Sequence, residues 1–159
     1  MRSIKQQVAL DATDTAILEH LQRDGRLSNL ELAQRVNLSP SACLRRVKLL
    51  DDRGVIAGYV ALVDPRAVGL TGTSFTIVNL ERLTAAVVSA FEEAVKAEPE
   101  ILDCFYVAGT SDYLIRFAYR DAADLERLHT HVLPRLPGVV RSNSMLVLRT
   151  VKRTTALPL

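Results

Sequence analysis

The chain of 159 residues contains no tryptophan, few aromatic side chains (5%) and only two cysteines. Cys43 and Cys104 stand far apart and match no CxxC or cysteine–histidine spacing, which argues against a zinc site or a disulfide framework and favours two small core side chains. No apolar run approaches the roughly 18 residues that a membrane span requires. Residues 1–7 lack the apolar stretch of a secretory signal peptide. We therefore expect a soluble, cytoplasmic protein with no metal or other cofactor and no membrane partner.

Hydrophobic residues make up 48% of the chain, which is enough for a buried core and excludes a disordered or collagen-like protein. The charges nearly cancel, with 20 Lys and Arg against 18 Asp and Glu. Residues 1–56 hold nine basic and seven acidic side chains, whereas residues 57–159 hold eleven of each. The whole positive excess therefore lies in the first third, which is where a polyanionic partner is expected to bind.

The first third of the chain predicts three short helices. Acidic residues open the first helix, at residues 11–24, and a Ser-x-x-Glu capping box opens the second, at 28–37. A serine N-cap followed by proline opens the third, which extends from residue 39 to 52. Two capped helices joined by about three residues are typical of a helix-turn-helix, in which the second helix reads DNA.

The exposed face of the helix at residues 39–52 is basic. At about 100° per residue, the inward face consists of Cys43, Leu44, Val47 and Leu50. Between residues 32 and 50 there are four basic side chains and no acid, whereas a solvated face normally mixes both signs, so a phosphate backbone is the expected partner. The expected DNA contacts are Ser39, Ser41, Ala42, Arg45, Arg46 and Lys48. The alternative is an amphipathic helical bundle whose exposed face is basic for no functional reason.

The remaining residues alternate between strand and helix patterns. The expected elements are strands at 75–80, 101–108, 113–119 and 139–151, and helices at 84–97 and 121–133. Their order predicts an α+β fold class: a three-helix winged helix-turn-helix domain followed by a βαββαβ, ferredoxin-like domain. The β-rich run at 55–63 forms either a wing or a strand that leads into the second domain. We expect domains at residues 1–56 and 71–159, with a linker at 57–70.

The ferredoxin-like plan places both helices on one face of the sheet and leaves the other face uncovered. Alternate side chains of the strand at 113–119 point to opposite faces, and both sets are largely apolar. An uncovered apolar face implies a partner, most simply a second copy of the chain. We therefore expect a homodimer that forms through the C-terminal domain.

Several longer motifs occur in a fixed order along the chain. They are Leu10–Asp14, Asp24–Ala33, Val36–Val47, Gly54–Tyr59, Gly109–Leu114 and Leu136–Val139. Together they closely resemble the leucine-responsive regulator/AsnC (feast/famine) family of prokaryotic transcription factors, and the resemblance spans residues 10 to 155. It implies a winged helix-turn-helix joined by a hinge strand to an effector-binding (RAM) domain. It also implies dimers that assemble into octamers and bind an amino acid or a related small molecule between dimers.

The same resemblance implies an effector site around residues 109–113. Backbone amides near Gly109 and Thr110 would bind a ligand carboxylate, and the Asp112 carboxylate would bind a ligand ammonium group. Serines replace the Thr-x-Thr that is common in the family's last strand. The expected effector contacts are Gly109, Thr110, Asp112, Tyr113, Ser142 and Ser144. Taken without the resemblance, Asp112 is a turn residue bonded to its own backbone, and the serines are ordinary surface residues of a strand.

Two other functions share this architecture. Siroheme decarboxylases resemble these regulators, but an enzyme of that kind needs no acid-free reading helix, and the sequence contains no nucleophile motif, phosphate loop or metal-ligand set. A small-molecule sensor that no longer binds DNA is the second alternative, and the intact helix at 39–48 argues against it. We expect a nucleoid-associated transcriptional regulator, not an enzyme, that binds an approximately palindromic double-stranded operator with half-sites about one helical turn apart.

Overall fold

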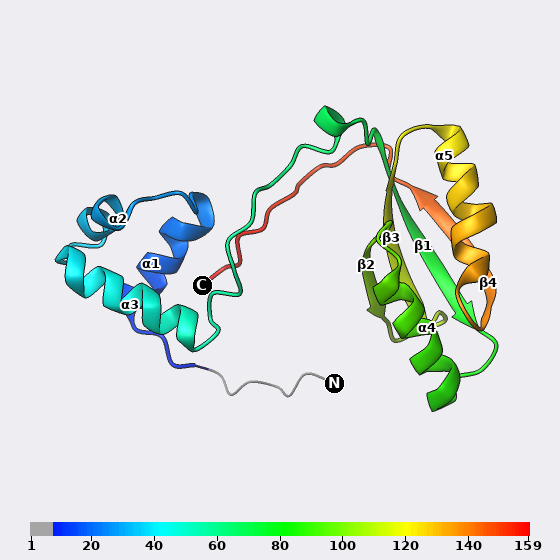
Figure 1. The fold of residues 1–159 in the computed structure, drawn as a ribbon, viewed down its shortest axis with the longest axis horizontal. Coiled ribbons are helices and arrows are strands. Elements are labelled where there is room, and N and C mark those ends of the chain that lie inside the picture. Colours follow the sequence, from blue (N-terminus) through cyan, green and yellow to red (C-terminus); the bar gives the residue numbers. More distant parts are fainter. Residues whose placement is uncertain (1–7) are drawn as a thin grey trace. The chain divides into compact units, whose positions relative to one another are not determined.

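A computed structural model describes residues 8–159 and contains two compact units (Figure 1). The first unit consists of the residues up to Ala61 together with Lys152–Leu159, and the second consists of Leu62–Val151. The division at Ala61 falls inside the segment 57–70 that was expected to be a linker. No helix between residues 8 and 159 is long and apolar enough to cross a membrane. The expectation that the chain has no signal peptide rests on residues 1–7, which lie outside the described residues.

Three capped helices form most of the first unit. They are α1 (Ala12–Arg23), α2 (Asn29–Arg35) and α3 (Pro40–Asp52), and each begins after the expected N-cap residue. Each N-cap side chain accepts a hydrogen bond from the backbone N–H three residues later, and α1 and α2 both have complete capping boxes. Asn37, whose φ of 53° lies in the left-handed region, turns the chain between α2 and α3.

Six buried side chains, two from each helix, hold the three helices together. They are Ile17, Leu18, Leu32, Ala33, Cys43 and Leu50. The predicted inward face of α3 is confirmed for Cys43 and Leu50, and Val47 packs against the same cluster. The prediction is wrong for Leu44, which is 58% exposed. Leu44 lies about 100° around the helix from Cys43, beyond the stripe of α3 that the other two helices cover.

The strand expected over residues 55–63 is not formed. Val55 and Ile56 donate backbone hydrogen bonds to the Leu50 carbonyl at the end of α3, and residues 57–63 have no regular secondary structure. A strand requires a neighbouring strand to accept and donate its backbone hydrogen bonds. Within residues 8–159 no strand pairs with this segment, so it is not part of a sheet.

The segment Lys152–Leu159 returns to the first unit, where it contacts α1. The Gln22 side chain accepts a hydrogen bond from the Leu157 N–H at 2.6 Å and donates one to the Leu157 carbonyl at 3.2 Å. Both bonds involve the Leu157 backbone, and the Leu157 side chain is exposed. The first unit is therefore built from two segments of the chain that the whole second unit separates.

The second unit is a four-stranded antiparallel sheet with two helices, in the expected βαββαβ order. Its elements are β1 (Gly72–Leu80), α4 (Ala85–Ala97), β2 (Ile101–Tyr106), β3 (Tyr113–Tyr119), α5 (Ala122–Arg127) and β4 (Val139–Leu146). The order of the strands in the sheet is β2-β3-β1-β4, so β1 is central and pairs with both β3 and β4. The strands β2 and β4 end two and five residues earlier than the sequence predicts.

One hydrophobic core lies between the sheet and the two helices. It combines Phe91 of α4 and Leu128, which directly follows α5, with Val78 of β1 and Ile115 of β3. Because side chains from both helical segments share one cluster with the sheet, α4 and α5 cover the same face (Figure 1). The opposite face is not covered by any helix of this unit.

The helix predicted at 121–133 is regular only as far as Arg127. A π-helical turn follows at Leu128–Val132, and a 3-10 turn at Leu133–Arg135 completes the segment. Pro134 has no backbone N–H to donate to an α-helical hydrogen bond, which accounts for the change in hydrogen bonding around it. The Thr130 hydroxyl donates to the Glu126 carbonyl at 2.9 Å and so occupies one carbonyl of the preceding turn.

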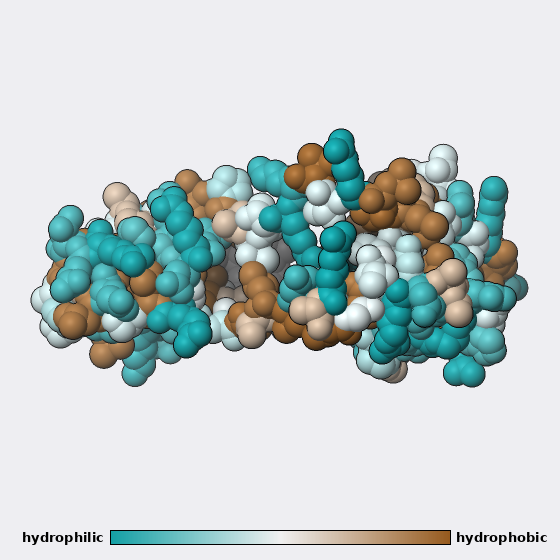
Figure 2. Space-filling model, turned by 90° about the horizontal axis from the view of Figure 1, so that it is seen from above, coloured by the Kyte–Doolittle hydropathy of each residue, from teal (hydrophilic) through white to brown (hydrophobic). Residues whose placement is uncertain are grey.

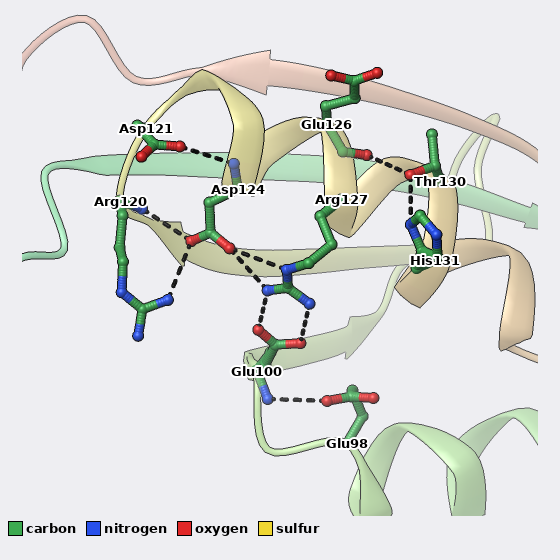
Figure 3. Close-up of polar contacts among 9 residues, drawn as sticks. All are labelled: Glu98, Glu100, Arg120, Asp121, Asp124, Glu126, Arg127, Thr130 and His131. Carbon is green, nitrogen blue, oxygen red and sulfur yellow. Dashed lines mark hydrogen bonds and ion pairs between the residues drawn. The ribbon is translucent and has the colours of Figure 1, made fainter.

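Charged side chains join α5 to the residues that flank two strands (Figure 3). Arg127 makes paired hydrogen bonds with Glu100, which precedes β2, and its Nη2 lies 2.8 Å from Asp124 Oδ1. Asp124 also accepts the Arg120 backbone N–H, which follows β3, at 3.0 Å. The backbone hydrogen bond from Arg120 is the largest cause that lowers the pKa of Asp124, and the hydrogen bond from Arg127 is the next.

We expect Asp124 to stabilise the second unit only while it is ionised. Because its pKa is lower in the folded chain than the ordinary value of 3.8, its contribution is present above that value and is lost as the pH falls through the folded-state pKa. Asp124→Asn should therefore be less stable than the wild type at neutral pH, and this difference should shrink as the pH falls from about 5 to about 3. Urea unfolding followed by tyrosine fluorescence measures it, because three of the four tyrosines lie in the second unit.

Glu126→Gln is the matched control for this measurement. Glu126 lies on α5 two residues after Asp124, and its carboxylate makes no hydrogen bond or ion pair with the other residues drawn in Figure 3. The control should be as stable as the wild type over the same pH range. A difference between wild type and Asp124→Asn that stays constant over this range would contradict the proposed role of the Asp124 charge.

Candidate functional site

Short side chains surround the N-terminal end of α3. Ser39 is the N-cap: its Oγ accepts the Ala42 N–H at 3.3 Å and lies 3.3 Å from the Ser41 Oγ. Asn29 Nδ2 donates to the Pro40 carbonyl at 2.8 Å, which ties the beginning of α2 to the beginning of α3. Ser39 and Ser41 are exposed. This end of the helix therefore leaves room for the edge of another molecule to approach closely.

The central part of α3 presents an exposed basic surface. Arg45 and Lys48 are exposed, and with Arg46, Leu49 and Asp52 they line a shallow surface depression. Neither Arg45 nor Lys48 makes an ion pair with an acidic side chain between residues 8 and 159. Figure 2 shows that the first unit is largely hydrophilic on the side in view, with scattered apolar side chains. Two unpaired cations on an exposed helix face are suited to contact phosphate groups.

Arg46 differs from its two basic neighbours, because its side chain is half-buried and bound within the unit. Its Nη1 donates to Asp11 Oδ2 and to Asp14 Oδ1, both at 2.7 Å. The pKa of Asp11 is lowered, first by the hydrogen bond from the Asp14 backbone and second by the hydrogen bond from Arg46. These partners were not predictable from the sequence, because 35 and 32 residues separate them from Arg46 and no local spacing signals the contact.

In the second unit, the loop between β2 and β3 is attached to the end of β1. The Asp112 N–H donates to the Val78 carbonyl at 3.1 Å, and Asp112 Oδ2 accepts the Leu80 N–H at 2.8 Å. Asn79 Nδ2 donates to the Thr110 carbonyl at 3.1 Å. The Asp112 carboxylate therefore bonds the backbone of a neighbouring strand, not its own turn. The sequence offered no signal for the partner, which lies 32 residues away.

The same loop carries groups that are free to bind a ligand. Gly109 has a φ of 137°, in the region that favours glycine, and a Cβ atom placed on it would have no atom within 4 Å. Gly109 and Thr110 are both exposed. Asp112 Oδ1 has no hydrogen-bond partner within residues 8–159, whereas Oδ2 is held by Leu80. Open backbone and a carboxylate oxygen thus lie on one firmly attached loop.

Tyr113, which directly follows the loop, belongs to the hydrophobic core. Its side chain is 2% exposed, packs on the Phe91 ring at a centroid distance of 4.4 Å, and donates its hydroxyl to Glu92 Oε1 at 3.0 Å. Burial, and then this hydrogen bond, raise the pKa of the Tyr113 hydroxyl. Tyr113 thus anchors the loop to the core.

The two serines lie on β4, across β1 from the loop. Ser142 pairs with Val78, and Val78 pairs on its other side with Tyr113. Adjacent strands are about 4.8 Å apart, so Ser142 lies about 10 Å from the beginning of β3. Ser142 is exposed, whereas the half-buried Ser144 shares a 2.7 Å hydrogen bond with the Thr76 hydroxyl. The register therefore brings the loop and the serines to the same end of the sheet.

Comparisons with known proteins match both parts of the chain. Residues 10–57 match a family of winged helix-turn-helix DNA-binding domains, and residues 73–157 match the Lrp/AsnC ligand binding domain. The leucine-responsive regulatory protein of Haemophilus influenzae is 40% identical over 155 residues, which cover 98% of this chain and 93% of that protein. The transcriptional regulator AzlB of Bacillus subtilis is 32% identical over 152 residues, which cover 96% and 97%.

Two solved structures are similar over almost the whole chain. A transcriptional regulator from Neisseria meningitidis in complex with L-Met has a TM-score of 0.90 and 40% identity, covering 94% of this chain and 97% of that one. A feast or famine regulatory protein from M. tuberculosis complexed with L-methionine has a TM-score of 0.84 and 31% identity, covering 94% and 99%. These relatives are named as regulators, which is consistent with a protein that is not an enzyme.

Proposed function

Because the chain belongs to the Lrp/AsnC family of transcriptional regulators, with a helix-turn-helix DNA-binding domain and a ligand-binding domain, we propose that an amino acid controls its binding to operator DNA. We assign residues 1–56 to the DNA-binding part, 57–70 to the hinge and 71–159 to the part that binds ligand and oligomerises, and the last segment of this third range, 152–159, packs with the first unit. A protein of this kind acts at the nucleoid in the cytoplasm. The observation that carries the proposal is the exposed face of α3, on which Arg45 and Lys48 are unpaired.

The DNA contacts follow from the arrangement of α3. Arg45 and Lys48 reach phosphates or base edges, while the backbone amides at the beginning of the helix bind a phosphate. The short side chains at that end leave space for base edges in the major groove. The proposed contacts are Ser39, Ser41, Ala42, Arg45 and Lys48. Arg46, which the sequence also predicts to be a contact, is left out because its Nη1 is bound to Asp11 and Asp14. A two-fold symmetric dimer presents two copies of α3, so the operator is approximately palindromic, with half-sites about 34–36 Å apart.

We expect Arg45→Ala and Lys48→Ala to weaken operator binding by about 5- to 150-fold, the effect of removing an interaction of about 1–3 kcal/mol. For each phosphate that the variant no longer neutralises, the slope of log K against log salt should decrease in magnitude by about 0.9. Fluorescence anisotropy of a duplex from the protein's own promoter, over a salt series, measures both quantities. Arg135→Ala, an exposed arginine of the second unit, should leave both unchanged. Equal decreases in affinity in all three variants would contradict the assignment to α3.

We place the amino acid at the loop that carries Gly109, Thr110 and Asp112. The free oxygen of Asp112 accepts the ligand ammonium group, and open backbone amides near Gly109 bind the ligand carboxylate. Ser142 and Ser144 supply hydroxyl groups at the same end of the sheet, and Tyr113 holds the loop from the core side. The attachment of the loop to β1 supports this placement, since a loop held in place before binding requires less ordering when the ligand arrives. The L-methionine complexes of the two similar structures make that amino acid the first to test.

We expect L-methionine or another of the twenty amino acids to raise the melting temperature, because a ligand that binds only the folded state stabilises it by about 2.7 kcal/mol at 100 times Kd. Asp112→Asn should abolish this increase, since the amide still accepts the Leu80 N–H but no longer attracts an ammonium group. Glu126→Gln, which removes an exposed carboxylate elsewhere in the unit, should retain the increase. An undiminished increase in Asp112→Asn would show that the ligand binds elsewhere, and no increase with any amino acid would refute the ligand class.

The uncovered face of the sheet supports a homodimer. The side chains on this face alternate with those of the core, and they include Phe75, Ile77, Phe105, Leu114 and Met145. Phe105 and Met145 are each about half exposed. An apolar face of this kind is most simply covered by the same face of a second copy, related by a two-fold axis. Such dimers then assemble into an octamer, with the ligand bound between dimers.

Met145→Asp should weaken the dimer by at least about 100-fold, because burying an unpaired carboxylate in the interface opposes association by about 3 kcal/mol or more. Sedimentation velocity over a concentration series measures the change. Leu83→Asp is the matched control, because Leu83 is 52% exposed and lies in the loop between β1 and α4, outside the strands of the sheet. A wild-type chain that sediments as a protomer, or a Met145→Asp dimer as tight as that of the control, would contradict this interface.

A further inference from the structure

The Arg46 side chain takes part in a complete set of hydrogen bonds at the beginning of α1. Its Nη1 lies 2.7 Å from one oxygen of Asp11 and 2.7 Å from one oxygen of Asp14. The other oxygens of these carboxylates form the capping box: Asp11 Oδ1 accepts the Asp14 N–H at 2.8 Å, and Asp14 Oδ2 accepts the Asp11 N–H at 3.5 Å. All four carboxylate oxygens and both hydrogens of Nη1 are therefore engaged.

The charge of this cluster is unsuited to contact with DNA. One guanidinium faces two carboxylates, so the three side chains together carry a net charge of −1. The Asp14 side chain is only 13% exposed, so solvent screens its attraction for Arg46 less than it screens a surface pair. A guanidinium that is neutralised in this way adds no net attraction for phosphate. Arg45 and Lys48 have no such partners and retain their full charge.

The cluster also lies where it controls the orientation of α3. In the sequence of α3, Arg46 lies between Cys43 and Leu50, the two residues that this helix buries in the core. Apolar contacts of this kind are not directional, whereas a charge-assisted hydrogen bond is. A helix with its side chains has a radius of about 5–6 Å, so a rotation of about 20° about its axis moves a contact atom by about 2 Å. That displacement is enough to break a hydrogen bond to a base edge.

We infer that Arg46, bound to Asp11 and Asp14, is a positioning residue that sets the rotation of the DNA-reading helix and does not itself contact DNA. The inference rests on the proposed DNA-binding function and deepens it. It assigns to two acidic residues a role that increases operator affinity, although their charge alone repels phosphate. The effect is on selectivity for the operator, because alignment with base edges matters for the correct sequence and not for a random one.

Replacing Asp14 by asparagine separates the two possible effects of this acid. If Asp14 acted only through its charge, Asp14→Asn would bind DNA more tightly than the wild type. If it positions α3, the affinity of the variant should fall about 5- to 150-fold for a duplex that the wild type selects from a random-sequence pool, and should stay unchanged for a shuffled duplex. Fluorescence anisotropy measures both affinities, and circular dichroism melting confirms that the variant is folded at the assay temperature.

Asp52→Asn is the matched control, because Asp52 lies on α3 beside Arg45 and Lys48 and makes no ion pair within residues 8–159. This variant should bind the selected duplex at least as tightly as the wild type. If Asp14→Asn also binds at least as tightly, the inference is overturned. If Asp14→Asn does not fold, Asp11→Asn provides the same test, since the Asp11 side chain is 53% exposed.

The salt dependence of binding gives a second, independent test. Arg46→Met should weaken specific binding without changing the slope of log K against log salt, whereas Arg45→Met should reduce the magnitude of this slope by about 0.9 for each phosphate that it no longer neutralises. Adding Asp14→Asn to Arg46→Met should cause no further decrease in affinity, since the partner is already gone. A reduced slope in Arg46→Met would overturn the inference. Absence of any salt-dependent complex with the wild type would instead count against the proposed function.

Discussion

The pairing of β1 with a strand on each side determines the layout of the ligand-binding unit. Val78 is fully buried and pairs with Tyr113 on one side and Ser142 on the other, so the β2–β3 loop and Ser142 lie on opposite sides of β1 near the same end of this strand. Because side chains alternate between faces, a shift of one residue in the β1–β4 register would turn the serines to the uncovered face and Met145 toward the helices. The proposed ligand site and the apolar face proposed for dimerisation therefore both depend on this register.

In both units, acidic side chains hold segments of the chain in position through hydrogen bonds. Asp112 uses one carboxylate oxygen for the Leu80 N–H and leaves the other free, whereas Asp11 and Asp14 use all of theirs within the first unit. In each case the acid bonds a part of the chain that is distant in sequence and adjacent in space. In the proposals made above, the basic residues of α3 therefore differ in function: those without an acidic partner contact DNA, and the one with two partners positions the helix. The sign of a side chain's charge thus says less about its role than the groups that surround it.

Features that depend on neighbours in sequence were predictable, and features that depend on neighbours in space were not. The three helices of the first unit begin where the sequence predicts, because an N-cap is decided within four residues. The βαββαβ order was also predictable, because each strand and helix is recognised from the pattern of its own residues. The missing strand at 55–63, the exposed Leu44 and the partners of Arg46 and Asp112 depend on which segments lie alongside, and no periodicity contains that information. The loop proposed to bind the ligand was predicted through the family resemblance, since glycine and aspartate in a hairpin are by themselves ordinary turn residues.

The hydrogen bonds between Gln22 and Leu157 join two segments that are far apart in the sequence and are therefore synthesised at different times. The Gln22 amide donates to the Leu157 carbonyl and accepts from the Leu157 N–H. The contact therefore depends on the backbone of the segment 152–159 and tolerates many side chains there. On the ribosome, α1, α2 and α3 emerge first, but the segment that binds α1 emerges only after residues 62–151 have been synthesised. The last segment of the first unit can therefore bind α1 only after residues 62–151 have been synthesised.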